Sequence, residues 1–172
     1  MPIELDNKEI NIDDIPIREV ISFDASKYQG FKIKIDNVWI DKNAINFYNG
    51  PLNSEGRPSY NSESKETMWK VIIETYPLPL LDEKGDIIEG KYVSFKIDDK
   101  NNPISYRVST TFNLTYRDGA WGISKNSRAL LWKFMRKMGA TKLSELKDKI
   151  VILDTAPDAD ENSDRVWLRI SK

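Results

Sequence analysis

Neither cysteine nor histidine occurs among the 172 residues of the chain. The fold therefore contains no disulfide and no zinc cluster, and thiolate and imidazole chemistry are both excluded. A chain of this length buries roughly two-thirds of its unfolded surface, so apolar packing can hold it together without such cross-links. We expect one domain that depends on its hydrophobic core and whose side chains suit binding better than catalysis.

Composition gives the class of protein. Hydrophobic residues make up 40% and charged residues 31% of the chain, an ordinary balance for a globular domain. No apolar run approaches the roughly 18 residues of a membrane helix, and the N-terminus lacks the features of a signal peptide. We expect a cytoplasmic protein with no membrane partner. The lack of Cys and near lack of Gln would suit a thermophilic source, whereas the many Ile, Lys and Asn residues would equally suit an AT-rich genome.

The net charge of −1 hides an uneven distribution. Residues 1–24 carry seven acidic and two basic side chains, so we interpret them as an acidic arm or edge segment before a single domain over residues 25–172. Residues 124–149 carry eight basic and two acidic side chains. Such segregation is typical of a polyanion-binding patch, although a solvated helix face gives the same pattern.

Alternation of apolar and polar residues predicts most of the fold. Phe31, Ile33 and Ile35 alternate with charged residues and indicate a strand that continues through residues 38–40, with a bulge near Asn37. Further strands are expected over residues 68–76, 92–97, 106–116, 149–153 and 165–170. The polar, turn-rich residues 49–66 form a long loop, which in a compact domain is usually functional or disordered. Residues 118–119, Asp-Gly, predict a tight turn.

One helix is expected over residues 126–138, with Ser124 as its N-cap and Gly139 just beyond its end. Its core-facing stripe contains Leu130, Leu131, Phe134, Met135 and Met138. The other side of the helix is basic and also carries a tryptophan. This secondary basic face consists of Lys125, Arg128, Trp132, Lys133 and Arg136.

The motifs of common enzymes are missing. No glycine-rich loop opens a helix, so neither a Rossmann nor a P-loop phosphate site is expected. A Ser-x-x-Lys match at residues 62–65 lies in the long loop without supporting context. The acidic pairs at 13–14 and 98–99 and the acidic group over 154–164 are better explained as solvated turns than as metal sites. We expect no catalytic residue, no metal and no cofactor.

Basic and aromatic residues alternate along the last expected strand. Its apolar positions face inward, so Arg165, Trp167 and Arg169 project from the outer face. Cations that follow the backbone and aromatic rings that stack on bases are how proteins hold single-stranded nucleic acid. The predicted nucleic-acid-binding residues are Lys32, Lys34, Lys70, Arg165, Trp167 and Arg169, with Trp69 or Tyr76 as further stacking rings. A Trp167 ring covered by other parts of the chain is the alternative.

The order of the expected elements resembles the oligonucleotide-binding (OB) fold, with its helix between the third and fourth barrel strands. The last 65 or so residues are also similar to small OB-fold proteins of phage, plasmid and archaeal replication cassettes. The similar pieces are the strand end at residues 108–111, a helix that leads from Ser124 and Ser127 to Gly139, and residues 146–151. Asp148 stands where that pattern has glycine, and about twelve extra residues lie around 115–123.

The resemblance implies a mostly-β, OB-like Greek-key barrel of five to six strands with an N-terminal arm. It further implies non-catalytic binding of single-stranded DNA or RNA, with replication proteins as further partners. A protein–protein interaction module on the same barrel is the alternative, and the acidic ends of the chain favour it. A metal-dependent nuclease that uses scattered Asp residues is the third hypothesis.

Overall fold

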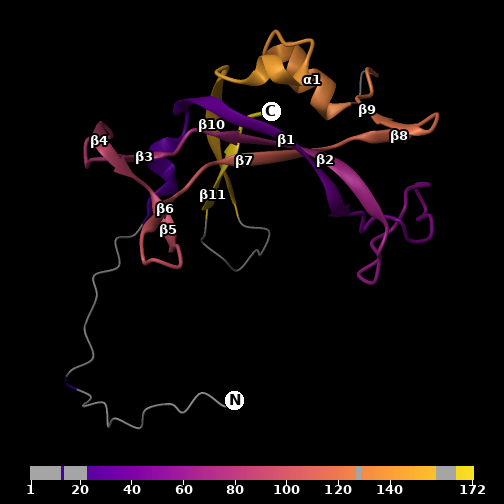
Figure 1. Ribbon diagram of the computed structural model, residues 1–172, viewed down its shortest axis with the longest axis horizontal. Helices are drawn as coiled ribbons and strands as arrows, with labels where there is room; N and C mark the ends of the chain where they lie inside the picture. Colours follow the sequence, from indigo (N-terminus) through magenta and orange to yellow (C-terminus); the bar gives the residue numbers. More distant parts are fainter. Residues whose placement is uncertain (1–12, 14–22, 127–128, 158–165) are drawn as a thin grey trace.

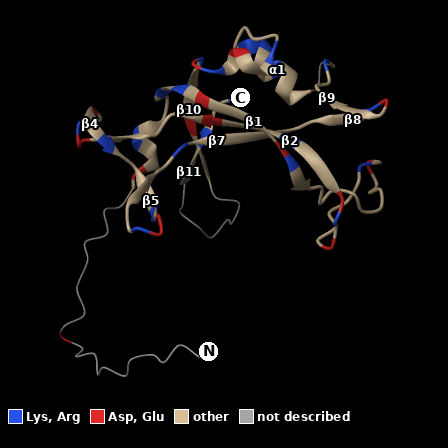
Figure 2. Cartoon of the chain, in the orientation of Figure 1, with Lys and Arg blue, Asp and Glu red and all other residues tan. Residues whose placement is uncertain are grey.

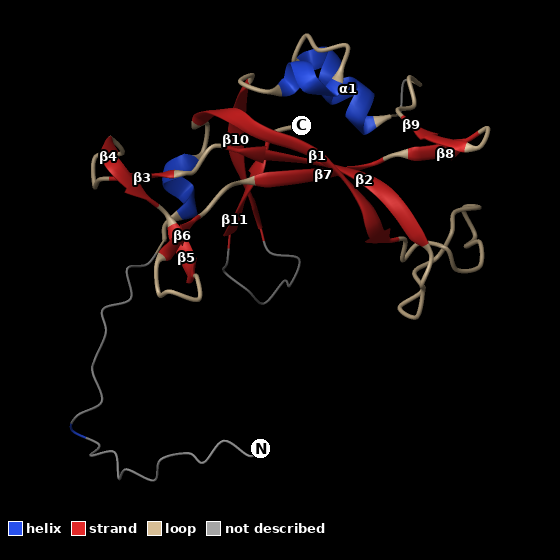
Figure 3. Ribbon diagram, viewed as in Figure 1, coloured by secondary structure: helices blue, strands red, loops and turns tan. Residues whose placement is uncertain are grey.

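The structure, a computed structural model, describes residues 13, 23–126, 129–157 and 166–172, apart from the side chain of Val166. Strands make up far more of the described chain than helices do, which confirms the predicted mostly-β class. Figure 3 shows the strands of one central sheet, with smaller hairpins on either side. The sheet contains β1 (Lys32–Ile45), β2 (Thr67–Thr75), β7 (Ser109–Asn113), β10 (Ile150–Pro157) and β11 (Val166–Ile170).

The other described elements are short. The hairpins are β3 (Pro79–Leu81) with β4 (Ile87–Tyr92), β5 (Ser94–Ile97) with β6 (Pro103–Ser105), and β8 (Thr115–Arg117) with β9 (Ala120–Gly122). The helices are the 3-10 helix η2 (Ala25–Tyr28), the α-helix α1 (Leu130–Lys137) and the 3-10 helix η3 (Leu143–Leu146). The turn between β8 and β9 has positive φ at both Asp118 and Gly119, which confirms the predicted tight turn.

The strand order is β11-β10-β1-β2-β7, and every neighbouring pair is antiparallel. The central strand β1 pairs with β10 over residues 32–34 and with β2 from Ile35 onward (Figure 1). A register shift between Ile35 and Asn37 separates the two parts and confirms the predicted bulge. Because a bulge bends a strand and increases its twist, one strand can serve both halves of the sheet.

The sheet is not a closed barrel in the part of the chain that the structure describes, since no ladder joins its outer strands β7 and β11. The two edges nevertheless approach each other near the C-terminus. The Nζ atom of Lys172, just beyond β11, lies 5.0 Å from the ring centroid of Phe112 on β7. The predicted closed barrel is therefore not found, and the described strands form an open sheet whose two edges approach each other near the C-terminus.

Alternating side chains from all five strands form the core, and α1 covers part of it. The rings of Phe112 on β7 and Phe134 on α1 pack with centroids 5.4 Å apart. The predicted helical stripe is only partly inside, because Leu130 is exposed and Met138 half-buried. The fully buried strand side chains include Ile35, Val71, Ile73, Val151, Leu153 and Ile170.

The helix is shorter than predicted, because it begins at Leu130 rather than at residue 126. The prediction of Ser124 as its N-cap is wrong: Ala129 occupies the N-cap position, and Oγ of Ser124 instead accepts a hydrogen bond from Nδ2 of Asn126 at 2.9 Å. The end of the helix is as predicted, with Gly139 just beyond it at a φ of +70°. The glycine supplies a backbone conformation that other residues rarely adopt.

The strand expected over residues 92–97 is divided between two hairpins. β4 ends at Tyr92 and β5 begins at Ser94, so neither half joins the central sheet. The cause lies at Val93, a buried residue whose N–H donates to the carbonyl of Leu78 and whose carbonyl accepts from the N–H of Tyr106. These bonds hold the chain between the hairpins. Similarly, the alternation over 106–116 contributes only β7 to the sheet.

One buried hydroxyl links β2 to the start of β7. Oγ1 of Thr75, a fully buried residue, accepts a hydrogen bond from the N–H of Val108 at 3.1 Å. Replacing Thr75→Val leaves that N–H without a partner, at a cost of about 1–3 kcal/mol in the free energy of unfolding. We expect urea titration to show this loss, and Thr67→Val, on the exposed end of the same strand, to change stability by much less. Equal effects of the two substitutions would contradict this role for the Thr75 hydroxyl.

Candidate functional site

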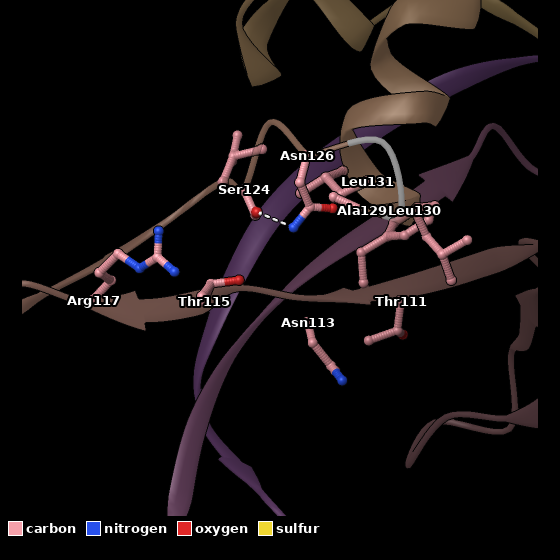
Figure 4. Close-up of a pocket in the computed structure, with 11 residues that line it drawn as sticks. Thr111, Asn113, Thr115, Arg117, Ser124, Asn126, Ala129, Leu130 and Leu131 are labelled. Carbon is pink, nitrogen blue, oxygen red and sulfur yellow. Dashed lines mark hydrogen bonds between the residues drawn. The ribbon is translucent and has the colours of Figure 1, made fainter. Parts of the chain in front are cut away.

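A groove runs between β7–β8 and the chain that leads into α1. It consists of two adjoining pockets of about 390 and 380 Å³, which share Thr115, Arg117, Ile123 and Ser124. Figure 4 shows the side chains of β7 and β8 in a row on one side, with Ser124 and Asn126 opposite them. We call this the polar groove.

The chemistry of the polar groove differs from that of the chain as a whole. The chain contains 27 acidic and 26 basic residues, yet none of the described residues that line the groove is acidic. Arg117 and Lys125 provide positive charge. Hydroxyl and amide groups come from Thr111, Asn113, Thr115, Ser124 and Asn126. The groove therefore attracts anions and offers them several hydrogen-bond donors.

The groove continues across the outer face of the sheet. Asn113 on β7 pairs with Lys70 on β2, and Ile72 on β2 pairs with both Thr111 and Trp39. Directly paired residues of an antiparallel sheet share a face and lie about 5 Å apart at Cβ. A continuous surface thus leads from the polar groove over β7 and β2 to the indole ring of Trp39 on β1, which is 41% exposed.

Sequence reasoning included Lys70 but missed Trp39 and Arg117. Trp39 lies beyond the bulge, where the inward and outward positions of β1 are displaced by one residue, so it faces outward beside Ile72. The signal for Arg117 was present in the alternation, because it has the same parity as Asn113 and precedes the Asp-Gly turn. Alternation along the strands gives no indication that the chain before α1 completes the groove.

The long loop between β1 and β2 presents a cluster of aromatic rings. Phe47 and Tyr60 stack with centroids 5.8 Å apart, and Tyr48 meets Tyr60 edge-on at 5.7 Å. The loop is held by its own hydrogen bonds, which include the donation from Oγ of the buried Ser64 to the carbonyl of Asn46 at 2.6 Å. The tyrosine rings are mostly exposed, so the loop forms an ordered aromatic surface. Figure 1 shows this loop and the β8–β9 hairpin toward the same side of the view.

The predicted nucleic-acid-binding residues fall on two separate regions of the sheet's outer surface. Lys32 and Lys34 pair with Ile152 and Ile150 on β10, whereas Lys70 lies opposite Asp41 near the other end of β1. The seven residue steps from position 34 to position 41 span about 23 Å of strand. The structure therefore does not bring Lys70 together with the other predicted lysines. Figure 2 shows the Lys and Arg positions, in blue, spread over several elements rather than in one cluster.

Trp167 and Arg169 lie on the outer face of β11, as their parity predicted, and Leu168 and Ile170 are buried. The indole of Trp167 is 55% exposed, so the ring is not covered by the described chain. Nε of Arg169 donates to Oδ1 of Asp154 at 2.6 Å, which neutralises part of the expected positive charge. Arg165 lies outside the described residues.

The secondary basic face is only partly available. Lys133 and Arg136 are exposed on α1, but the ring of Trp132 is half-buried against the core. The Nζ atom of Lys125 lies 5.0 Å from the centroid of that ring, within cation–π range. Arg128 lies outside the described residues. This face joins the polar groove through Lys125.

The two further stacking candidates are engaged elsewhere. Trp69 faces inward and stacks on Trp121 with centroids 6.0 Å apart, and Nζ of Lys42 lies 4.8 Å from the Trp69 ring. The hydroxyl of Tyr76 donates to Oδ1 of Asp148 at 2.9 Å. Asp148 has a φ of 64°, a conformation that favours glycine.

The acidic residues belong mainly to turns. Oδ1 of Asp98 accepts from the N–H groups of Lys100 and Asn102, and these bonds, that from Asn102 foremost, lower the pKa of Asp98. Asp82 accepts from the N–H groups of Lys84 and Asp86 in the same way. In the described part of the chain, no three acidic side chains gather as metal ligands would.

Comparisons with protein-family models, with curated proteins and with solved structures found no match to this chain. Among the described helices, none has the length and apolar character needed to cross a membrane.

The hydrogen bond from Tyr76 to Asp148 predicts that the stability of the fold decreases at alkaline pH. The hydrogen bond to the carboxylate, with burial and nearby negative charge, raises the pKa of Tyr76 above its usual 10.0. A group whose pKa is higher in the folded state than in the unfolded state stabilises the fold. This stabilisation is fully present below the pKa of the unfolded state and is lost as pH rises through the pKa of the folded state. We expect Tyr76→Phe to lower stability at pH 8 and to flatten its decline above pH 10. Tyr60→Phe, in the exposed loop, serves as the control, and identical pH profiles for both variants would refute the expectation.

Proposed function

We propose that this protein binds single-stranded nucleic acid, most readily DNA, without catalysis. The observation that carries the proposal is the acid-free polar groove, which continues over β7 and β2 to an exposed tryptophan. Cations and hydroxyl groups in the groove contact phosphates, and Trp39 stacks on a base. This combination is the usual basis of sequence-tolerant binding to single strands.

The strand order supports an OB-like arrangement. The five strands of the sheet follow in the chain as β1, β2, β7, β10 and β11, and α1 lies between the third and fourth of them. An OB fold has its helix at this place, is often only partly closed, and binds oligonucleotides on the face of its second and third strands. Here those strands are β2 and β7, which carry Lys70, Thr111 and Asn113.

The electrostatics favour the polar groove over the outer face of β10 and β11. Lys70 and Arg117 make no ion pair with any described residue, whereas Arg169 is paired with Asp154. The aromatic loop 46–66 adds stacking surface in the position of the first OB loop, which also contacts oligonucleotides. Phosphate contacts supply most of the affinity, and the rings limit how the bases lie.

A protein–protein interaction module is the second candidate function. The two hairpins between β2 and β7 expose several large apolar side chains, which in a soluble protein often mark a docking surface. These are Ile87, Tyr92, Phe95, Ile97 and Ile104. Capture of a replication protein by the immobilised chain after nuclease treatment, lost on Ile97→Asp with Ile104→Asp, would favour this function over nucleic-acid binding.

Removal of groove charges tests the proposed face. Affinity for an oligonucleotide falls with salt in proportion to the phosphates contacted, with a slope of about −0.7 per contact for single strands. We expect Lys70→Gln with Arg117→Gln to reduce the slope by about 1.4 through two lost contacts. The matched control, Lys32→Gln with Lys34→Gln, leaves the slope unchanged. Fluorescence titration at several salt concentrations measures both, and an effect of the control pair alone would contradict the assignment of the face.

Trp39 tests the stacking contribution. Loss of one stacked base costs about 1–3 kcal/mol in binding free energy. We expect Trp39→Ala to weaken oligonucleotide binding by that amount with the salt slope nearly unchanged, because no phosphate contact is lost. Trp167→Ala, which removes a similarly exposed indole from the other face, leaves the affinity as it was. Binding that Trp39→Ala does not alter would remove the stacking role from this residue.

A further inference from the structure

The outer face of the sheet around β10 is both cationic and apolar. Lys32 and Lys34 of β1 flank Ile152 and Ile150 on one side of β10, and residues of β11 flank it on the other. We call this the β10 face; its residues are Lys32, Lys34, Ile150, Ile152, Asp154, Trp167 and Arg169, of which Asp154 and Arg169 form an ion pair.

The β10 face has unused binding capacity of two kinds. Ile150 and Ile152 on β10 are 54% and 45% exposed, and Trp167 on β11, beyond the Asp154–Arg169 ion pair on the same side of the sheet, is 55% exposed. Lys32 and Lys34 form no ion pair with any residue that the structure describes. Aliphatic isoleucines offer a nucleotide no ring on which to stack, so the face suits a partner with aliphatic side chains and negative charge.

The first 22 residues of this chain have that chemistry. They contain six acidic and two basic residues, and also six isoleucines. Ile10 alternates with Ile12, and Ile15 with Ile17, among acidic neighbours. A segment with this pattern can direct isoleucines to one side and leave carboxylates beside them to meet lysines.

The described chain that follows this segment packs Phe23 against Phe95 of β5 and reaches β10 at Gln29 and Gly30. Oε1 of Gln29 accepts from both the N–H and the hydroxyl of Thr155 at 2.9 Å, and the N–H of Gly30 donates to the carbonyl of Leu153 at 2.8 Å. These bonds fix the chain that follows η2 against β10. A segment of 22 residues can extend up to about 70 Å, and the eight residues of β10 span about 26 Å. The segment can thus reach the whole β10 face.

We propose that the β10 face is the docking surface for the acidic, isoleucine-rich segment formed by residues 1–22. The isoleucines of the segment cover Ile150, Ile152 and Trp167, and its carboxylates lie against Lys32 and Lys34. The pairing is separate from the polar groove. It therefore does not depend on nucleic-acid binding and can fail or succeed independently.

The absence of cysteine permits a direct test on the full chain. A single Asn11→Cys substitution allows one nitroxide label to be attached within the segment. We expect strong paramagnetic broadening of the amide signals of Lys32 and Ile152 and of the Trp167 indole signal, relative to the reduced label. The amide signals of Thr111 and Asn113, on the face of the polar groove, remain sharp.

Charge reversal supplies the second arm of the experiment. Lys32→Glu with Lys34→Glu places like charges opposite the segment and should abolish the broadening, while the exposed positions allow the fold to persist. Lys133→Glu with Arg136→Glu, on α1, is the matched control and should leave it unchanged. In a mixture of spin-labelled protein without isotope enrichment and isotope-enriched protein without the spin label, broadening would show that the segment of one molecule docks on another. This result would also support the proposal. Broadening that is absent, lies on the polar groove, or survives the Lys32 and Lys34 reversal would overturn it.

Discussion

The bulge in β1 determines how the rest of the molecule is arranged. Before it, β1 pairs with β10, and after it β1 pairs with β2, so both halves of the sheet are joined through this one strand. Asp36, at the bulge, forms an ion pair with Arg107, which itself lies just before β7. The pair ties the centre of the sheet to the chain that enters its edge. Both outward faces depend on this local geometry, because the bulge sets which residues of β1 face the solvent.

The separation of the two faces explains how a nearly neutral chain can present cationic surfaces. Many acidic side chains are used locally, as in the turns at Asp82 and Asp98, where each carboxylate accepts backbone N–H groups. The polar groove is lined instead by residues of β7, β8 and the chain before α1, none of which is acidic. Local hydrogen bonding in these turns thus holds the carboxylates of Asp82 and Asp98 at the tips of hairpins, away from the polar groove.

The sequence predicts local features well because their causes are local. Alternation identified β1, β2 and β11 and the inward direction of Leu168 and Ile170, and Gly139 marked the end of α1. The predicted start of α1 was wrong, because the Ser124 side chain forms a hydrogen bond with Asn126 in a loop and does not cap the helix. The candidate site was predicted in pieces only. Whether Lys70 lies near Lys32 depends on strand pairing between distant segments, and alternation contains no information about that pairing.

The absence of histidine and cysteine affects both proposed surfaces in the same way. Side chains of Asp, Glu, Lys, Arg and Tyr have ordinary pKa values below about 4.5 or above about 10, so none of these types normally changes charge near neutral pH. The cations of the polar groove and of the β10 face come from lysine and arginine side chains. Ionic strength is then the variable that controls them, because exposed charges are screened over about 8–10 Å at cellular salt. The apolar part of the β10 face is insensitive to such screening, so salt weakens contacts in the polar groove more than contacts with an isoleucine-rich segment.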